Sequence, residues 1–221
     1  TNGGYLMCQL PGLGVTEAQT YAHLLQGYTL RGMTGDVDQT ALILNALPVP
    51  AEAWALDRVE PLYRLGLGGL TCDAVLRGPG AGDSALLTGW MRDQMVETGT
   101  TTPERAQADA AERAQAAIAG GRIRLLIEDG APVAMAALNA KAGPAVQVGG
   151  VFVPRDLRGA GRGGRVVQAL LAEEARAGAQ TAILFAASPD AARVYERIGF
   201  DRVGAYRVAL LRDPLPLGSP T

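Results

Sequence analysis

The segment RDLRGAGRGGRVV, residues 155–167, carries four glycines and four arginines and leads into an apolar helical pattern. Glycines let successive backbone N–H groups converge on one point because no Cβ stands in the way. The start of a helix adds about half a positive charge at the same place. These features favour the binding of a pyrophosphate, with a plain surface turn as the alternative.

Two phosphate motifs fit this loop, and they predict different enzymes. Gly159, Gly161 and Gly164 match G-x-G-x-x-G, the dinucleotide fingerprint of nicotinamide oxidoreductases. Arg158, Gly161 and Gly163 match R-x-x-G-x-G instead. A dinucleotide fold needs its first glycine directly after a strand and a carboxylate about 20 residues later. The sequence meets neither condition, and no Lys-Ser or Lys-Thr follows the glycines as in a Walker motif, so the second spacing is favoured.

Hydrophobic periodicity predicts a mixed α/β arrangement around the loop. Asp129-Gly130 is a strong hairpin signal between two apolar strands. The expected strands are 122–129, 132–140, 145–153, 181–187 and 201–211, and the expected helices are 83–99, 102–119, 163–177 and 190–198. Gly120 is the expected stop of the second helix.

The first 75 residues repeat a strand–helix order more weakly. Strands 5–10, 28–33 and 59–67 alternate with helices 16–26 and 37–47. The strand DRVEPLYRL echoes DRVGAYRV near the C-terminus, which either an internal duplication or a chance likeness of amphipathic strands would explain. With LRGPGAGD as the boundary, we expect domains at 1–72 and 73–213 and a tail at 214–221.

Composition excludes several classes of protein. The chain has 221 residues, 48% of them apolar, and a net charge of -2, so no long-range attraction to nucleic acid or anionic membranes is expected. No apolar run is long enough to span a bilayer and the first residues do not resemble a signal peptide, so we expect a soluble cytoplasmic protein. Cys8 and Cys72 fit no metal spacing and His23 is the sole histidine, so no metal site is expected.

With its predicted strands, glycine loop and helices in this order, the segment 73–211 resembles the GNAT superfamily of N-acetyltransferases. The resemblance is carried by the strand GGVFVP, the loop from Arg158 to Gly163, and SPDAARVYERIGF with Tyr195 and Gly199-Phe200. It implies the GNAT acyl-CoA N-acyltransferase fold, in which helices flank a central mixed, mostly antiparallel sheet. It also implies acetyl-CoA as the co-substrate.

The resemblance assigns cofactor-binding residues as well. In the family, pantetheine lies where the strand before the loop splays from the next strand, with the thioester near 149–151. Gly149-Gly150 then marks the bulge that opens the gap, or else a packing pair of glycines. Arg162 and Arg165 would add charge for the ribose phosphate, while Arg158 would pack against or cap the loop. The residues expected to bind coenzyme A are Val151, Phe152, Val153, Arg158, Gly159, Ala160, Gly161, Arg162, Gly163, Gly164 and Ser188.

Tyr195 stands where the family places its general acid, seven residues after Ser188. A phenol with a pKa of about 10 can hydrogen-bond a thiolate and protonate it. The alternative is an amphipathic tyrosine that covers a helix–sheet seam. Many family members carry asparagine near Ser188, so serine there weakens the cofactor contact that the resemblance implies.

No general base is evident. Gln147 cannot take a proton, and Glu128 and Asp129 are expected to be solvated hairpin ends. His23 is expected to be a solvated helix residue, with a base role as the alternative, and ordered water could also serve. Because the N-terminal half lacks both an arginine–glycine loop and a matching tyrosine, we expect it to bind no acetyl-CoA and to wall the acceptor side.

Two functions remain in competition. The first is an acetyl-CoA-dependent N-acetyltransferase, with direct attack by the primary amine of a small molecule or protein and Tyr195 as general acid. The second is a non-catalytic acyl-CoA-binding regulatory protein. The loop and Tyr195 favour the enzyme, whereas the missing base and Ser188 favour the binding protein.

Overall fold

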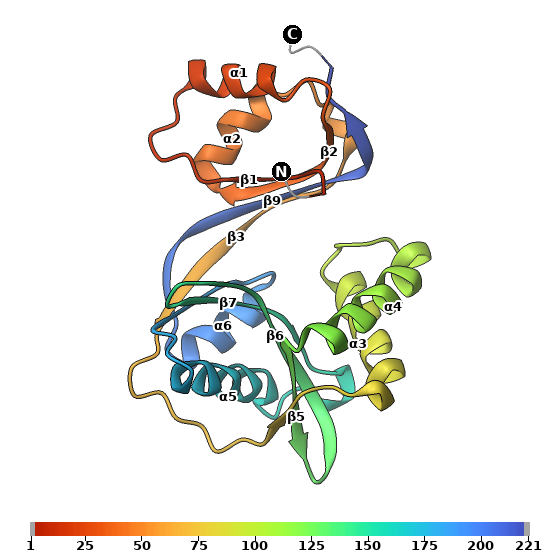
Figure 1. The fold of residues 1–221 in the computed structure, drawn as a ribbon, viewed down its shortest axis with the longest axis vertical. Coiled ribbons are helices and arrows are strands. Elements are labelled where there is room, and N and C mark those ends of the chain that lie inside the picture. The colour runs from red at the N-terminus through yellow and green to blue at the C-terminus, as the bar shows by residue number, and fades with distance from the viewer. Residues whose placement is uncertain (1–2, 219–221) are drawn as a thin grey trace. The chain divides into compact units, whose positions relative to one another are not determined.

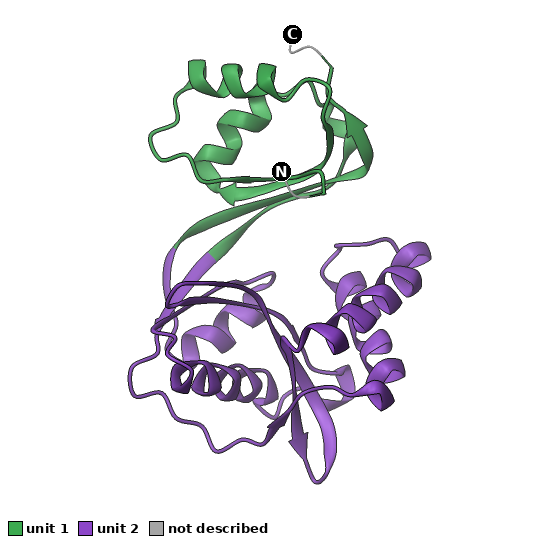
Figure 2. Ribbon diagram, viewed as in Figure 1, with its two compact units in different colours: residues 1–61, 204–221 green, residues 62–203 purple. Residues whose placement is uncertain are grey.

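Two long strands, β3 (Trp54–Gly66) and β9 (Asp201–Pro216), each cross from one unit of the chain to the other. The computed structural model describes residues 3–218, and its contacts group the chain into unit 1, up to 61 and from 204 onward, and unit 2, residues 62–203 (Figure 2). This division differs from the predicted domains 1–72 and 73–213 because each unit includes strand segments from both halves of the sequence. The predicted tail begins inside β9, and its residues 219–221 lie outside the described part.

The strands are hydrogen bonded in the order β1-β2-β9-β3-β8-β7-β6-β5-β4. Two pairs are parallel, β1–β2 and β7–β8. The antiparallel pairs are β2–β9, β3–β8, β4–β5, β5–β6 and β6–β7. The new bounds are β1 Tyr5–Cys8, β2 Thr29–Asp36, β4 Leu76–Arg77, β5 Ile123–Glu128, β6 Ala131–Ala142, β7 Ala145–Phe152 and β8 Thr181–Phe185. This confirms the predicted mixed, mostly antiparallel sheet with flanking helices (Figure 1).

Unit 1 has the predicted strand–helix order, with α1 (Val15–Leu24) and α2 (Val37–Ala46) between its strands. Strand β9 adds to it between β2 and β3. Leu6 and Leu30, each between exposed residues, form a core with Met33 of β2 and Ile43 of α2. The apolar faces of α1 and α2 therefore cover one side of this small sheet.

In unit 2, helices lie on both faces of the sheet (Figure 1). One pair is α3 (Ser84–Glu97) with α4 (Pro103–Gly120), and the other is α5 (Arg162–Arg176) with α6 (Pro189–Arg197). Neighbouring residues of β5 divide between the two cores, Leu125 toward α3 and α4 and Leu126 toward α5 and α6. A strand buried on both sides is apolar without alternation, which explains the continuous apolar runs in the sequence.

Turn chemistry sets the limits of these elements. Asp129 and Gly130 have φ values of 49° and 77° in the β5–β6 turn, as the hairpin prediction requires. Helix α4 is followed by Gly121 in the left-handed region, φ 65°, so the predicted stop at Gly120 is one residue early. Three short 3₁₀ turns, η1 Ala51–Ala53, η2 Ala81–Asp83 and η3 Arg155–Leu157, complete the elements. Within residues 3–218, no helix is both long and apolar enough to cross a bilayer.

Candidate active site

The parallel strands β7 and β8 open into a gap. They pair only from Ala145 to Gln147 on β7 and from Thr181 to Ile183 on β8. Beyond that point β7 continues along β6, while β8 continues along β3. The splay expected from the family resemblance is thus confirmed, and main-chain groups of both strands border the gap.

A bulge in β7 accompanies the opening. Met135 pairs with Phe152 but Ala137 pairs with Gly149, so β7 has one extra residue between these two pairs. Gly150 has a φ of 59°, which favours glycine. A Cβ on Gly149 would lie 2.2 Å from Nδ2 of Asn139. Both interpretations of the glycine pair therefore hold, with Gly150 in the bulge and Gly149 in a close packing contact.

Side chains already engage the end of β7. The Val151 carbonyl accepts a hydrogen bond from Nε2 of Gln94 at 3.0 Å, and the Val153 carbonyl accepts one from Nε of Arg158 at 2.8 Å. Phe152 between them is buried against Trp90, and the Arg158 guanidinium lies 5.7 Å from the Phe152 ring centre. These contacts of Arg158 are with the end of β7 and with Glu97, so its expected packing against or capping of the glycine loop stays a prediction. Contacts of these residues with coenzyme A remain predictions.

The glycine loop ends at an open helix terminus. Gly159 and Gly161 have φ values of 86° and 73°, and Ala160 lies between them. Gly161 caps α5 without a side-chain hydrogen bond, and the first turn contains no acidic residue. The first N–H groups of a helix have no carbonyl partner within it, so those of Gly163 and its neighbours suit an anion. Gly164 has a second reason to be glycine, since a Cβ there would lie 3.1 Å from Cγ2 of Ile198, the residue that follows α6.

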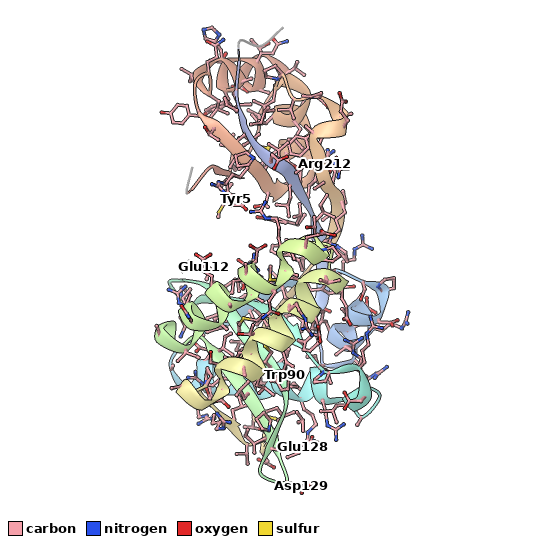
Figure 3. All side chains as sticks on the ribbon, turned by 90° about the vertical axis from the view of Figure 1, so that its right-hand side faces the viewer. Tyr5, Trp90, Glu112, Glu128, Asp129 and Arg212 are labelled. Atoms are coloured by element: carbon pink, nitrogen blue, oxygen red, sulfur yellow. The ribbon has the colours of Figure 1, made fainter. Side chains whose placement is uncertain are left out.

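Glu128 binds both arginines at the start of α5. Its two carboxylate oxygens accept from Nε of Arg162, at 2.7 Å, and from Nη1 of Arg165. Arg162 also donates to the Leu157 carbonyl at 2.7 Å, which closes the loop. Glu128 lies at the tip of the β5–β6 hairpin (Figure 3), with 18% of its side chain exposed. The expectation that Glu128 is a solvated hairpin end is wrong, because it balances two cations of the loop.

Helix α6 is anchored to the sheet around Tyr195. Ser188 caps this helix, its Oγ accepting from the Ala191 N–H at 3.2 Å. Tyr195 is 7% exposed and packs at a tilt against Phe200, with ring centres 6.0 Å apart. The next residue, Glu196, accepts a hydrogen bond of 2.6 Å from the buried Tyr63 hydroxyl, which raises the pKa of Tyr63. Tyr195 does cover a helix–sheet seam, and its role as an acid remains a prediction.

The other sequence candidates are dispersed. His23 is exposed on α1 in unit 1, and Gln147 sits at the last β7–β8 pair in unit 2. Cys8 and Cys72 are free thiols. Among the described residues, no group of three or more histidine, cysteine or acidic side chains is arranged to hold a metal ion.

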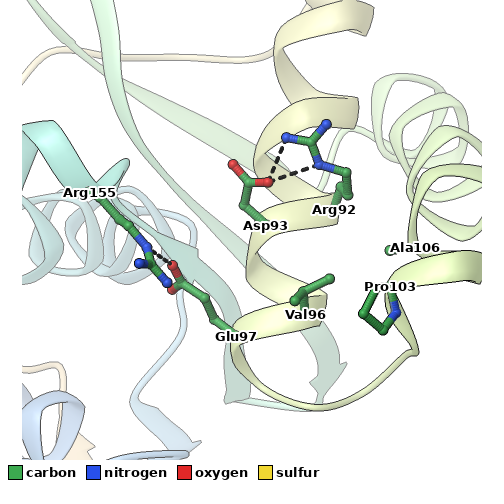
Figure 4. A pocket seen from close by; sticks show the side chains of 7 residues that line it. All are labelled: Arg92, Asp93, Val96, Glu97, Pro103, Ala106 and Arg155. Atoms are coloured by element: carbon green, nitrogen blue, oxygen red, sulfur yellow. Dashed lines mark hydrogen bonds and ion pairs between the residues drawn. The ribbon is translucent and has the colours of Figure 1, made fainter.

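A cavity of about 400 Å³ lies beside α3, α4 and the start of the loop (Figure 4). Its wall mixes two ion pairs, Arg92 with Asp93 and Arg155 with Glu97. Its apolar lining consists of Val96, Pro103 and Ala106. Helices α3 and α4 correspond to the helices predicted at 83–99 and 102–119. Sequence reasoning missed Glu97 and Gln94, whose contacts on the loop and β7 are about 60 residues away in the chain.

Comparison with known proteins places this geometry in context. The model of the acetyltransferase (GNAT) domain family matches residues 91–209. No curated protein matches the chain. Similar solved structures are a GNAT-family protein from Novosphingobium aromaticivorans (21% identity, TM-score 0.56, 100% of this chain and 86% of that one) and a GNAT-family acetyltransferase from Colwellia psychrerythraea (15%, 0.61, 96% and 78%). A GCN5-related N-acetyltransferase from Kribbella flavida is also similar (15%, 0.59, 94% and 80%). At these identities the structures support the fold alone.

Proposed function

Because the chain belongs to the GNAT acetyltransferase family, we propose that it is an N-acetyltransferase that moves the acetyl group of acetyl-CoA to a primary amine. The observation that carries the proposal is the gap between β7 and β8, which opens beside a glycine-rich helix terminus whose first turn contains no acidic residue. A strand gap offers hydrogen bonds to the amides of pantetheine. The helix terminus offers N–H groups to the pyrophosphate.

The cofactor would be held mainly by main-chain groups. Residues 151–153 would bind pantetheine, and residues 159–164 would bind the pyrophosphate. Arg162 and Arg165 can add charge for the ribose phosphate only by sharing it with Glu128. We therefore assign most of the phosphate affinity to the N–H groups and the helix dipole.

Acetyl transfer requires a neutral amine, donors for the developing oxyanion and a proton for the leaving thiolate. The neutral amine nitrogen attacks the thioester carbonyl and a C–N bond forms, the nitrogen then loses a proton to solvent water, and the C–S bond breaks as the tetrahedral intermediate collapses. Tyr195 then donates its phenolic proton to the sulfur. A thiol with a pKa of about 8.5 is a stronger acid than a phenol with a pKa of about 10, so transfer of the proton from phenol to thiolate is slightly unfavourable. The proton is therefore transferred only as negative charge develops on the sulfur, and the tyrosine then regains a proton from solvent. The cavity beside α3 and α4 would take the amine of a small molecule or a protein.

The test is a steady-state assay of acetyl-CoA consumption over a panel of amines, with Tyr195→Phe compared with wild type. We expect turnover to fall by roughly a hundredfold or more while coenzyme A affinity, measured by calorimetry, stays within about twofold. Tyr28→Phe, at an exposed tyrosine in unit 1, is the matched control. Full turnover in Tyr195→Phe would remove Tyr195 from the mechanism.

A second candidate is an acyl-CoA-binding regulatory protein. It is favoured by the commitment of Glu128 to two arginines, which takes the nearest hairpin carboxylate out of consideration as a base. Coenzyme A uptake without turnover of any amine would establish this alternative. We expect either protein to work in the cytoplasm.

A further inference from the structure

The last turns of α3 touch both parts of the proposed cofactor cleft. Gln94 contacts the bulged segment of β7, and Glu97, one turn later, contacts Arg155 and Arg158 beside the glycine loop. We propose that Gln94 and Glu97 are positioning residues, a latch on α3 that sets the geometry of thioester strand and phosphate loop. The inference rests on the proposed function and deepens it.

Gln94 supplies a partner that the sheet does not. A bulge takes a residue out of the ladder and leaves its main-chain groups without a strand partner. The Gln94 amide donates to the Val151 carbonyl at this point, 3.0 Å away. Because the peptide unit is planar and trans, fixing that carbonyl toward α3 turns the Phe152 N–H to the opposite side. Gln94 thus orients a peptide within the segment that would bind pantetheine.

Glu97 fixes the other end of the segment. Its two oxygens accept from Nε of Arg155 and from Nη2 of Arg158, each at 2.8 Å, with 25% of the Glu97 side chain exposed. Partial burial acts to raise the pKa of Glu97, but the hydrogen bonds from the two arginines outweigh it and the pKa lies below its usual value. Arg158 in turn holds the Val153 carbonyl. The chain from Glu97 to Val153 therefore sets where β7 ends and the loop begins.

The same turn also faces the cavity beside α3 and α4. Glu97 and Arg155 form part of the cavity wall (Figure 4). An acceptor that reached Arg155 would meet a guanidinium already held by the latch. The two residues therefore connect the acceptor side and the cofactor side through one ion pair.

The test separates the two contacts by kinetics. Gln94→Met keeps length but loses the donor, and Gln94→Glu keeps shape but turns an ionised oxygen toward the Val151 carbonyl. We expect both to lower kcat about tenfold, with the KM for acetyl-CoA within about twofold. Glu97→Gln should raise the KM for acetyl-CoA about five- to tenfold with a smaller change in kcat. Gln107→Met and Glu112→Gln, at exposed positions of α4, are matched controls.

The outcomes distinguish this inference from the proposed function. If wild type is active and the Gln94 and Glu97 variants have the same kcat and KM as wild type, the latch is overturned and the proposed acetyltransferase function is not affected. Losses of kcat and KM that merely follow the folded fraction, measured by circular dichroism, would also overturn it. A wild type that binds coenzyme A but acetylates nothing would end the proposed function, and the coenzyme A affinity of Glu97→Gln would still decide the latch. If coenzyme A does not bind at all, both proposals fail.

Discussion

Each unit of the chain contains a parallel strand pair next to a glycine-containing loop and a helix, but the two helix starts differ. In unit 1, β1 and β2 pair residue for residue from Tyr5 to Cys8, and the carboxylate of Glu17 accepts the Gly14 N–H at 2.6 Å before α1. In unit 2, β7 and β8 part after three pairs, and α5 begins without an acid. Both loops contain glycines at positive φ, Gly12 in unit 1 and Gly161 in unit 2.

The two glycine-containing loops differ in how much of the adjoining helix start the protein's own side chains occupy. In unit 1 the protein's own carboxylate already lies where an anion would bind at the helix start, and Gln39 takes the Leu10 N–H of the same loop at 2.6 Å. In unit 2 the equivalent N–H groups meet no acid from their own helix. If unit 2 alone binds coenzyme A, as proposed, its parted strand pair and the absence of an acid from the first turn of α5 would account for the difference.

The largest expected effect comes from Tyr63, which belongs to the core of unit 2 although its strand begins in unit 1. Tyr63→Ala removes a fully buried side chain and should lower the free energy of unfolding by about 3–5 kcal/mol. Urea unfolding of the full chain measures it. Val59→Ala, on the same strand but 53% exposed, should change stability by less than about 0.5 kcal/mol. Equal losses in the two variants would contradict the assignment of Tyr63 to this core.

The next effect tests the helix start directly. Gly163→Glu places a carboxylate in the first turn of α5, as Glu17 does in α1, and should weaken coenzyme A binding about ten- to a hundredfold, because the acid competes for the N–H groups and repels phosphate. Gly163→Ala is the control, since its Cβ would lie 3.7 Å from Val153. Calorimetry gives both affinities. If Gly163→Glu bound coenzyme A as tightly as wild type, an acid at the helix start could not explain the expected difference between the two units.

An acid at another helix start within unit 2 should act on stability alone. Asp83, before α3, is bound by Arg77 and the Gly80 N–H, and the hydrogen bond from Arg77 is the main reason that its pKa falls to about 2. A lowered folded-state pKa adds stability above the ordinary aspartate range, and this stability is lost as pH falls from about 4 to 2. Asp83→Asn should cost about 1–2 kcal/mol at pH 7, allowing for the exposed arginine. The difference in the free energy of unfolding between wild type and Asp83→Asn should shrink as pH falls from 7 to 2. A difference that stays constant over this range would refute the pairing of Asp83 with Arg77.

The smallest effect sharpens the comparison from the side of unit 1. Glu17→Gln removes the charge at the start of α1 and should cost less than about 1 kcal/mol. Because β1 and β2 stay paired, we expect no second coenzyme A site to appear. Calorimetric stoichiometry should remain one per chain. Two molecules of coenzyme A bound per chain would mean that Glu17 alone had prevented binding to unit 1.

Features with local causes could be predicted from the sequence. A turn with two residues at positive φ marks Asp129-Gly130, and a bulge that favours glycine marks Gly149-Gly150. The cap at Ser188 could not be separated from a cofactor contact, because one hydroxyl suits both. Local chemistry thus located the loop and most of the elements, whereas the gap was expected from the family resemblance.

Contacts made by folding alone could not be predicted. Glu128 meets Arg162 across 34 residues, and Gln94 meets Val151 across 57, with no spacing rule to connect them. The predicted domains differ from the compact units for a related reason. An amphipathic strand such as β3 has the same pattern whichever sheet it joins, so the echo between β3 and β9 could not reveal that each contributes to both units.

The path of β9 has a consequence for synthesis on the ribosome. Strands β1, β2 and β3 are translated well before β9, yet β9 completes the sheet of unit 1 between β2 and β3. At about 5–20 residues per second, the segment that carries β1 and β2 therefore stays partly formed until β9, residues 201–216, has been synthesised. Chaperones that shield exposed strand edges would meet this segment first, and ribosome stalling before β9 would leave it unfinished.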